Sequence, residues 1–111
     1  MKLNHLNLTV TDVEAAAAFL VTYFGLKPEG GNKGMALLRD DNDMVVTLMK
    51  AKTVDYPQTF HIGFIQDSDA KVDALNERLK ADGFDVKPPE RSHAWTFYVR
   101  APGGFIVEVM A

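Results

Sequence analysis

Apolar and polar residues alternate at the start of the chain. In the stretch NHLNLTV, residues 4–10, apolar side chains occupy every second position. Successive side chains of a β-strand point to opposite faces, so this pattern predicts a strand with one buried face. The polar residues between the apolar ones belong to the other face, and these are His5, Asn7 and Thr9.

The next segment, residues 11–26, changes to helical spacing. Thr11 followed by Glu14 matches a capping box, which predicts a helix N-terminus there. Gly25 suits the position just after a helix end. The following KPEGGNKG is rich in turn-forming residues, and two apolar runs then surround Asp40–Asp43, which predicts a β-hairpin.

The second half of the chain repeats this plan. TFHIGFI alternates as a strand, residues 67–84 have helical spacing, and WTFYVR and FIVEVMA predict two strands around APGG. When the halves are aligned on His5 and His61, each histidine precedes a helix that ends at a glycine. The sequence therefore predicts a single α+β domain of two βαβββ units, about residues 1–54 and 55–111, whose curved mixed sheets surround a cavity.

The alternation also indicates which strand residues face that cavity. In the last strand the regularly apolar set should pack beneath a helix, which leaves Glu108 on the free face between Ile106 and Met110. A carboxylate among apolar side chains is costly to desolvate, and a cation would reduce this cost. Two imidazoles and one carboxylate suit Fe²⁺ and also accept Mn²⁺, Ni²⁺ or Zn²⁺. We therefore expect His5, His61 and Glu108 to bind a divalent metal ion.

Taken one at a time, these three residues are more often structural or exposed than functional. The case for a site depends on the repeat, because His5 and His61 occupy equivalent positions and the chain has only three histidines. Three protein ligands leave coordination positions open, and a metal ion with open positions can act on a substrate.

The amino-acid composition limits which kinds of partner and which cellular compartment are expected. The chain has 111 residues, enough for one domain, and a net charge of −3 without a basic stripe, so nucleic-acid binding is not expected. It contains no cysteine, which excludes disulfides and thiolate ligands. The longest apolar stretch is about half of what a membrane span needs, and no signal peptide is visible. We expect a soluble cytoplasmic protein whose partner is a small-molecule substrate.

Three stretches resemble the vicinal oxygen chelate superfamily, which contains glyoxalase I, extradiol dioxygenases, fosfomycin-resistance enzymes and bleomycin-resistance proteins. They are LNHLNLTVTD, FHIGF and FYVRAPGGFIVEV, and the resemblance covers essentially the whole chain. In metal-binding members the ligands lie on the first and last strands of each unit, which implies His5, Thr47, His61 and Glu108 here. Thr47 departs from this pattern, because the family's carboxylate is missing there. The resemblance therefore implies a His-His-Glu site, as in extradiol dioxygenases and fosfomycin-resistance enzymes, rather than the four ligands of glyoxalase I.

The resemblance also implies roles around the metal. Tyr98 falls where extradiol enzymes carry an active-site tyrosine, and His93 is a candidate base near neutral pH. Pro88 stands where fosfomycin-resistance enzymes carry a lysine, so the chain departs from those enzymes at this position. We expect catalytic roles for Tyr98 and His93. The residues expected to contact substrate, from the free faces or from the resemblance, are Asn7, Thr9, Thr47, Arg91, Ser92, Thr96 and Arg100.

Two functions remain open. The first is a metal-dependent enzyme with dioxygenase-like or lyase, isomerase or transferase chemistry on an oxygen-chelating substrate. The second is a non-catalytic protein that binds a drug or metabolite, similar to bleomycin-resistance proteins, which generally lack the metal ligands. Members of this size commonly pair, so we expect a twofold homodimer whose ligands come from one chain or from two.

Overall fold

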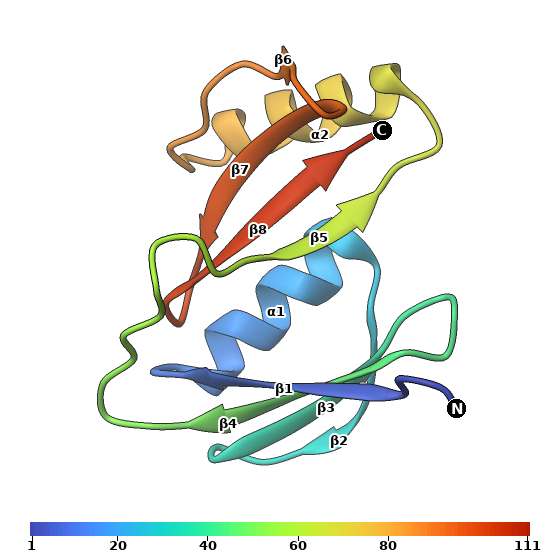
Figure 1. Cartoon of the computed structure of the whole chain (residues 1–111). Helices are drawn as coiled ribbons and strands as arrows, with labels where there is room; N and C mark the ends of the chain where they lie inside the picture. Colours follow the sequence, from blue (N-terminus) through green and yellow to red (C-terminus); the bar gives the residue numbers. More distant parts are fainter. The chain divides into compact units, whose positions relative to one another are not determined.

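The computed structural model describes all 111 residues and contains two compact units. The first unit comprises Met1–Tyr56 with Pro102–Gly104, and the second comprises Pro57–Ala101 with Phe105–Ala111. Each unit has one open four-stranded mixed sheet and one helix (Figure 1). The predicted α+β architecture of two βαβββ units is therefore confirmed.

The first unit has the strand order β1-β4-β3-β2. Strand β1 runs parallel to β4, and the other pairs are antiparallel. Because β1 and β4 are parallel neighbours, the remaining strands and the helix form the connection between them. The elements are β1 (His5–Val10), α1 (Val13–Phe24), β2 (Lys27–Gly31), β3 (Met35–Arg39) and β4 (Val45–Lys50).

The second unit repeats this topology, with the strand order β5-β8-β7-β6 and a parallel pair formed by β5 and β8. The internal repeat predicted from the sequence is thus present in the structure. The elements are β5 (Ile62–Ile65), α2 (Asp69–Ala81), β6 (Glu90–Arg91), β7 (Trp95–Ala101) and β8 (Phe105–Met110).

Several boundaries differ from the sequence predictions. The N-cap of α1 is Asp12 rather than Thr11, because the Asp12 carboxylate accepts the backbone N–H of Ala15 at 3.0 Å. The segment predicted as a turn contains β2, an edge strand with an irregular register, where proline and glycine are tolerated. Strand β5 begins at Ile62, so His61 lies just before it rather than within it.

The predicted strand faces are confirmed. Leu8 and Val10 of β1 are fully buried, and so are the alternate residues Phe105, Val107 and Val109 of β8. These residues form the apolar cores on which the helices pack, and their alternating neighbours occupy the free faces of the sheets. The free faces of β1 and β8 therefore carry Asn7, Thr9 and Glu108.

The helices are short. They contain 12 and 13 residues, and neither is long and apolar enough to cross a lipid bilayer.

Candidate functional site

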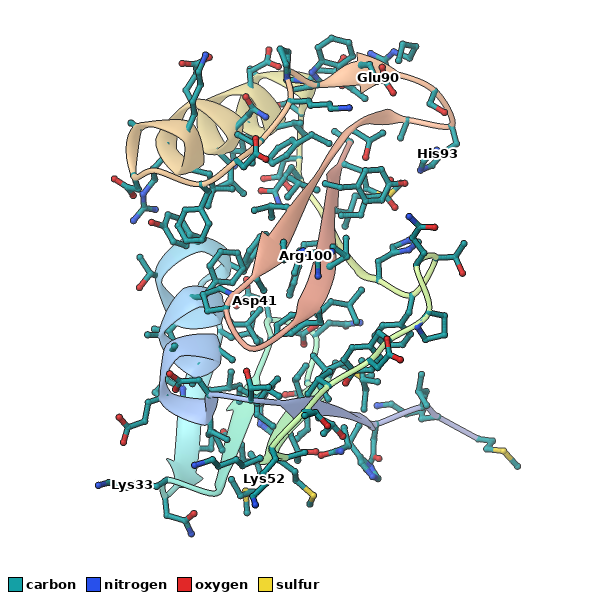
Figure 2. All side chains as sticks on the ribbon, turned by 90° about the vertical axis from the view of Figure 1, so that its left-hand side faces the viewer. Lys33, Asp41, Lys52, Glu90, His93 and Arg100 are labelled. Atoms are coloured by element: carbon teal, nitrogen blue, oxygen red, sulfur yellow. The ribbon has the colours of Figure 1, made fainter.

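Glu108 is the centre of a polar cluster on the free face of the second unit's sheet. The carboxylate comes from β8, Thr96 and Tyr98 come from β7, and His61 immediately precedes β5. His93 lies on the loop that follows Glu90, as Figure 2 shows. Although Glu108 belongs to the free face, these neighbours leave it only 4% exposed.

The two oxygens of the Glu108 carboxylate have different partners. Oε2 lies 2.6 Å from His93 Nε2 and accepts the Thr96 hydroxyl at 2.6 Å. Oε1 lies 3.3 Å from His61 Nε2. The Thr96 hydroxyl also lies 3.0 Å from the Val109 carbonyl, and its single proton serves one of these two acceptors at a time. The carboxylate is therefore oriented by side chains from both sides.

These contacts decide the ionisation of the cluster. Burial alone would raise the pKa of the Glu108 carboxyl, but hydrogen bonds from Thr96 and His93 and the charge of His93 outweigh it and lower this pKa. Partial burial, followed by the negative charge of Glu108, raises the pKa of the Tyr98 phenol. At neutral pH the cluster therefore holds a charged carboxylate beside a protonated phenol.

The imidazole of His61 directs its Nε2 at this carboxylate. Its Nδ1 lies 2.9 Å from the Thr59 carbonyl, which only accepts hydrogen bonds, so Nδ1 carries the proton. In the neutral ring Nε2 is then an acceptor, and it faces the Glu108 oxygen at 3.3 Å. Two acceptors at this distance repel each other unless a proton or another cation lies between them. A histidine whose tautomer is set by a backbone carbonyl is typical of metal ligands.

His5, in the first unit, has a similar arrangement. This exposed residue begins β1, and its Nδ1 lies 2.8 Å from the Asn4 side-chain oxygen. With Nδ1 engaged in this way, Nε2 of the neutral ring remains an acceptor. The two histidines that the repeat pairs thus both direct Nδ1 at an oxygen from a nearby residue of the chain.

The other free-face residues of the first unit bond with one another or with a tyrosine. The Thr47 hydroxyl donates to the Asn7 side-chain oxygen at 2.8 Å, across a register pair of β1 and β4. Thr9 is half-buried, and its backbone N–H and carbonyl both bind the Tyr56 hydroxyl, at 2.7 and 2.9 Å. Thr47 therefore supplies a neutral hydroxyl where the family pattern has a carboxylate.

The other residues predicted to contact substrate lie on β6, on β7 and in the loop between them. Arg91 forms an ion pair with Asp69 of α2, and its guanidinium lies 5.2 Å from the centre of the Trp95 ring. These contacts anchor the loop that carries the exposed Ser92. Arg100 is exposed on β7 (Figure 2), two residues beyond Tyr98 and so on the same face.

The three expected metal ligands do not all belong to one unit. No group of three or more His, Asp or Glu side chains is arranged to hold a metal ion in this structure. His61 and Glu108 fit as two adjacent ligands, since their acceptor atoms face each other within the second unit. His5, the third expected ligand, belongs to the first unit.

Sequence reasoning missed how His93 and Thr96 are used. It assigned His93 a catalytic role but not this contact, in which His93 Nε2 lies 2.6 Å from Glu108 across a separation of 15 residues. Thr96, expected to contact substrate, is 3% exposed and donates its hydroxyl to Glu108. The alternation of β7 placed Thr96 on the correct face, whereas no pattern in the sequence marks a contact between a loop and a strand.

Comparisons with known proteins agree with this architecture. The sequence model of the Glyoxalase/Bleomycin resistance protein/Dioxygenase superfamily matches residues 2–109. A solved structure of a possible glyoxalase from Bacillus cereus is 54% identical, with a TM-score of 0.97, and the match covers 100% of this chain and 99% of that one. No curated protein sequence matches.

More distant structures share the fold. Lactoylglutathione lyase from Agrobacterium tumefaciens is 22% identical, with a TM-score of 0.79 and coverage of 98% of this chain and 92% of that chain. A mutant of the genomically encoded fosfomycin resistance protein FosX from Listeria monocytogenes, complexed with Mn(II) and 1S,2S-dihydroxypropylphosphonic acid, is 23% identical, with a TM-score of 0.84 and coverage of 99% and 91%.

Proposed function

Since this chain belongs to the Glyoxalase/Bleomycin resistance protein/Dioxygenase superfamily, we propose that it is a metal-dependent enzyme acting on a small molecule. The substrate would present two adjacent oxygen atoms to a divalent ion. The observation that carries the proposal is the geometry of His61, whose Nδ1 donates to the Thr59 carbonyl and whose Nε2 faces a Glu108 oxygen at 3.3 Å. A cation between these atoms would remove their repulsion.

The residues proposed to hold the ion are His61, Glu108 and His5. The first two are adjacent in the second unit, and His5 is proposed from the internal repeat and from its matching ring orientation. When bound, the ion would supply Lewis-acid stabilisation of negative charge that develops on a substrate oxygen. Nitrogen and carboxylate ligands suit Fe²⁺, Mn²⁺, Ni²⁺ or Zn²⁺. The Mn(II) in the FosX complex supports a divalent ion in this fold.

Three side chains of the cluster have proposed roles beside the ion. Thr96 holds the Glu108 carboxylate in position through its buried hydroxyl. His93, bonded to Glu108 through Nε2, is placed to transfer a proton at that atom. The raised pKa of Tyr98 keeps its phenol protonated, so Tyr98 can donate a hydrogen bond to a substrate oxygen. The resulting reaction is lyase, isomerase, transferase or dioxygenase chemistry.

Metal analysis tests this proposal directly. The protein is purified without a chelator or a histidine tag, its metal content is measured, and the stripped protein is titrated with Fe(II), Mn(II), Ni(II) and Zn(II) by calorimetry. We expect about one ion per chain, lost in His61→Ala and in Glu108→Ala, because each removes a ligand. His93→Ala is the comparison variant: it should weaken binding only about tenfold, because His93 contacts the ligand Glu108 without belonging to the proposed ligand set.

A protein that is isolated without metal and takes up none of the four ions would contradict the enzyme proposal. It would instead support a protein that binds a drug or metabolite without chemistry. If His93→Ala loses the ion as completely as His61→Ala does, the ligand set is wrong even though a metal site exists.

We also propose a twofold homodimer that acts in the cytoplasm. The proposal of a dimer is supported by the division of the expected ligands between two units that share one topology. Light scattering coupled to size-exclusion chromatography measures the mass. A monomer across the micromolar range would contradict this proposal and leave the metal site untouched.

A further inference from the structure

A pocket of about 440 Å³ lies beside the Glu108 cluster in the second unit. One wall is formed by β7 and includes Thr96 and Tyr98. Thr96 donates its hydroxyl to Glu108, and Tyr98 is the register partner of Glu108 on the neighbouring strand. The pocket therefore adjoins the residues to which we assign the reaction, and its volume is in the range typical of small-molecule sites.

The rest of the lining comes from the segment of residues 85–90, which contributes three charged side chains. They are Asp85, Lys87 and Glu90, and all three are exposed. No ion pair joins any of them to another residue. The pocket thus presents two carboxylates and one ammonium group whose charges are not neutralised within the protein.

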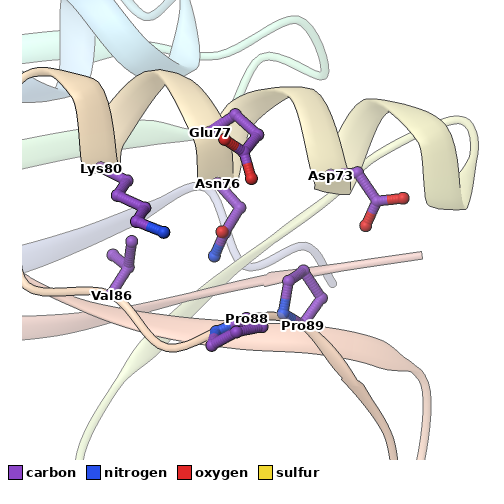
Figure 3. Close-up of a pocket in the computed structure, with 7 residues that line it drawn as sticks. All are labelled: Asp73, Asn76, Glu77, Lys80, Val86, Pro88 and Pro89. Atoms are coloured by element: carbon purple, nitrogen blue, oxygen red, sulfur yellow. The ribbon is translucent and has the colours of Figure 1, made fainter.

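The segment that carries these charges is held in place from α2. Asn76 is only 3% exposed, and its side-chain N–H donates to the Lys87 carbonyl at 2.8 Å. Figure 3 shows Asn76 extending from α2 towards the segment with Pro88 and Pro89, whose rings restrict the backbone. Glu90, on β6, is the strand-register partner of Thr96 on β7. The charged wall is therefore positioned before a ligand arrives, which reduces the entropy lost on binding.

We propose that this pocket binds an amino-acid-like part of the substrate, with its ammonium group near Asp85 and Glu90 and its carboxylate near Lys87. A compound with only negative charge would meet two carboxylates for one ammonium group, and a compound with only positive charge would meet Lys87. A zwitterion satisfies both signs. This proposal rests on the proposed function only in treating the ligand as part of the enzyme's substrate. Binding of the amino-acid-like part in this pocket requires no metal.

Three probes of matched length test the proposal on metal-free protein. L-norleucine carries both charges, hexanoate lacks the ammonium group, and pentylamine lacks the carboxylate. Backbone amide shifts are followed by NMR during titration with each probe. We expect norleucine to shift residues 85–90 and 96–98 and to bind at least about tenfold more tightly than either other probe.

Two charge-removing variants locate the binding. Lys87→Gln should weaken norleucine binding about tenfold and leave pentylamine and norleucine nearly equal, because only the ammonium contacts remain. Lys80→Gln is the matched control: it removes a lysine of a separate cavity, between α2 and the same segment (Figure 3), and should not change the affinity. The proposal is overturned if norleucine does not bind, if a singly charged probe binds as well, or if Lys87→Gln has no effect. Because the metal is absent throughout, none of these results depends on the metal site.

Discussion

The two units share one topology but differ at one equivalent position. Thr47 of β4 lies between Asn7 of β1 and Leu37 of β3, whereas Glu108 of β8 lies between Gly63 of β5 and Tyr98 of β7. In the first unit the position holds a neutral hydrogen bond between two strands.

In the second unit the same position holds a charge. Gly63 has no side chain, and a Cβ built there would lie 3.9 Å from that of Glu108, so β5 contributes no polar group beside the carboxylate. The carboxylate is met instead by His61, His93 and Thr96. The repeat therefore gives both units the same backbone arrangement. A few different residues on the free face of the second unit place ionisable side chains there.

The largest expected effect on metal affinity comes from replacing Glu108 with threonine, the residue at the equivalent position of the first unit. In Glu108→Thr the carboxylate is replaced by a hydroxyl, so we expect metal affinity to fall by more than about 100-fold. The measurement is calorimetric titration of the stripped protein. Retained affinity in this variant would show that the metal, if bound, depends on other residues.

Mixing two variants, each lacking one proposed ligand, tests whether the proposed ligands come from one chain or from two. His5→Ala and Glu108→Ala are unfolded and refolded together. If the ligands come from two chains, about one quarter of the sites should regain metal, because half of the dimers are mixed and each has one intact site. No recovery is expected if each chain supplies all of its own ligands. Metal content per chain distinguishes the two results.

Removing the hydroxyl that orients the carboxylate should have a smaller effect. In Thr96→Val the Glu108 Oε2 loses a buried donor at 2.6 Å. We expect metal affinity to fall about tenfold, as for other residues that orient a ligand. The free energy of unfolding should fall by about 1 to 3 kcal/mol. Thr96→Ser, which keeps the hydroxyl, should restore the affinity, and a failure to do so would assign the effect to packing.

The units should also differ in how their stability depends on pH. The folded protein lowers the pKa of Glu108, so its interactions stabilise the fold above the ordinary carboxyl pKa and are lost as pH falls through the lower folded value. Urea unfolding of the metal-free protein should show a difference between wild type and Glu108→Gln at pH 7 that shrinks in acid. A difference that is constant with pH would contradict the ionised Glu108.

The smallest effect is expected in the first unit. Thr47→Val removes the hydrogen bond to Asn7, which is exposed, so the free energy of unfolding should fall by no more than about 1 kcal/mol. Metal affinity and the pH dependence of stability should stay as in wild type. A strong loss of metal in Thr47→Val would mean that the hydroxyl takes the part of the missing fourth ligand.

Much of the fold was predictable because its signals are local. The alternation of β1 and β8, the helical spacing of residues 67–84 and the hairpin at Asp40–Asp43 each depend on a few neighbouring residues. The wrong predictions also concerned neighbouring residues. Asp12 replaced Thr11 as the cap, and β2 formed in a stretch that reads as a turn because an edge strand tolerates proline and glycine.

The candidate site was predictable only in part. The repeat and the face parity selected His61 and Glu108, which the structure brings within 3.3 Å of each other. The loop residue His93 and the charged wall of residues 85–90 could not be placed in this way, because a loop has no periodicity from which its direction can be read.

The sequence by itself determined the two βαβββ units, their buried faces and the side chains available on their free faces, since these follow from spacing along the chain. The tertiary structure alone decided that Glu108 is buried and ionised, that the Thr59 carbonyl sets the tautomer of His61, and that Asn76 holds the wall of the pocket. These properties depend on distances between groups from different strands and loops, and on the exclusion of water around them. Neither quantity is encoded in any single stretch of residues.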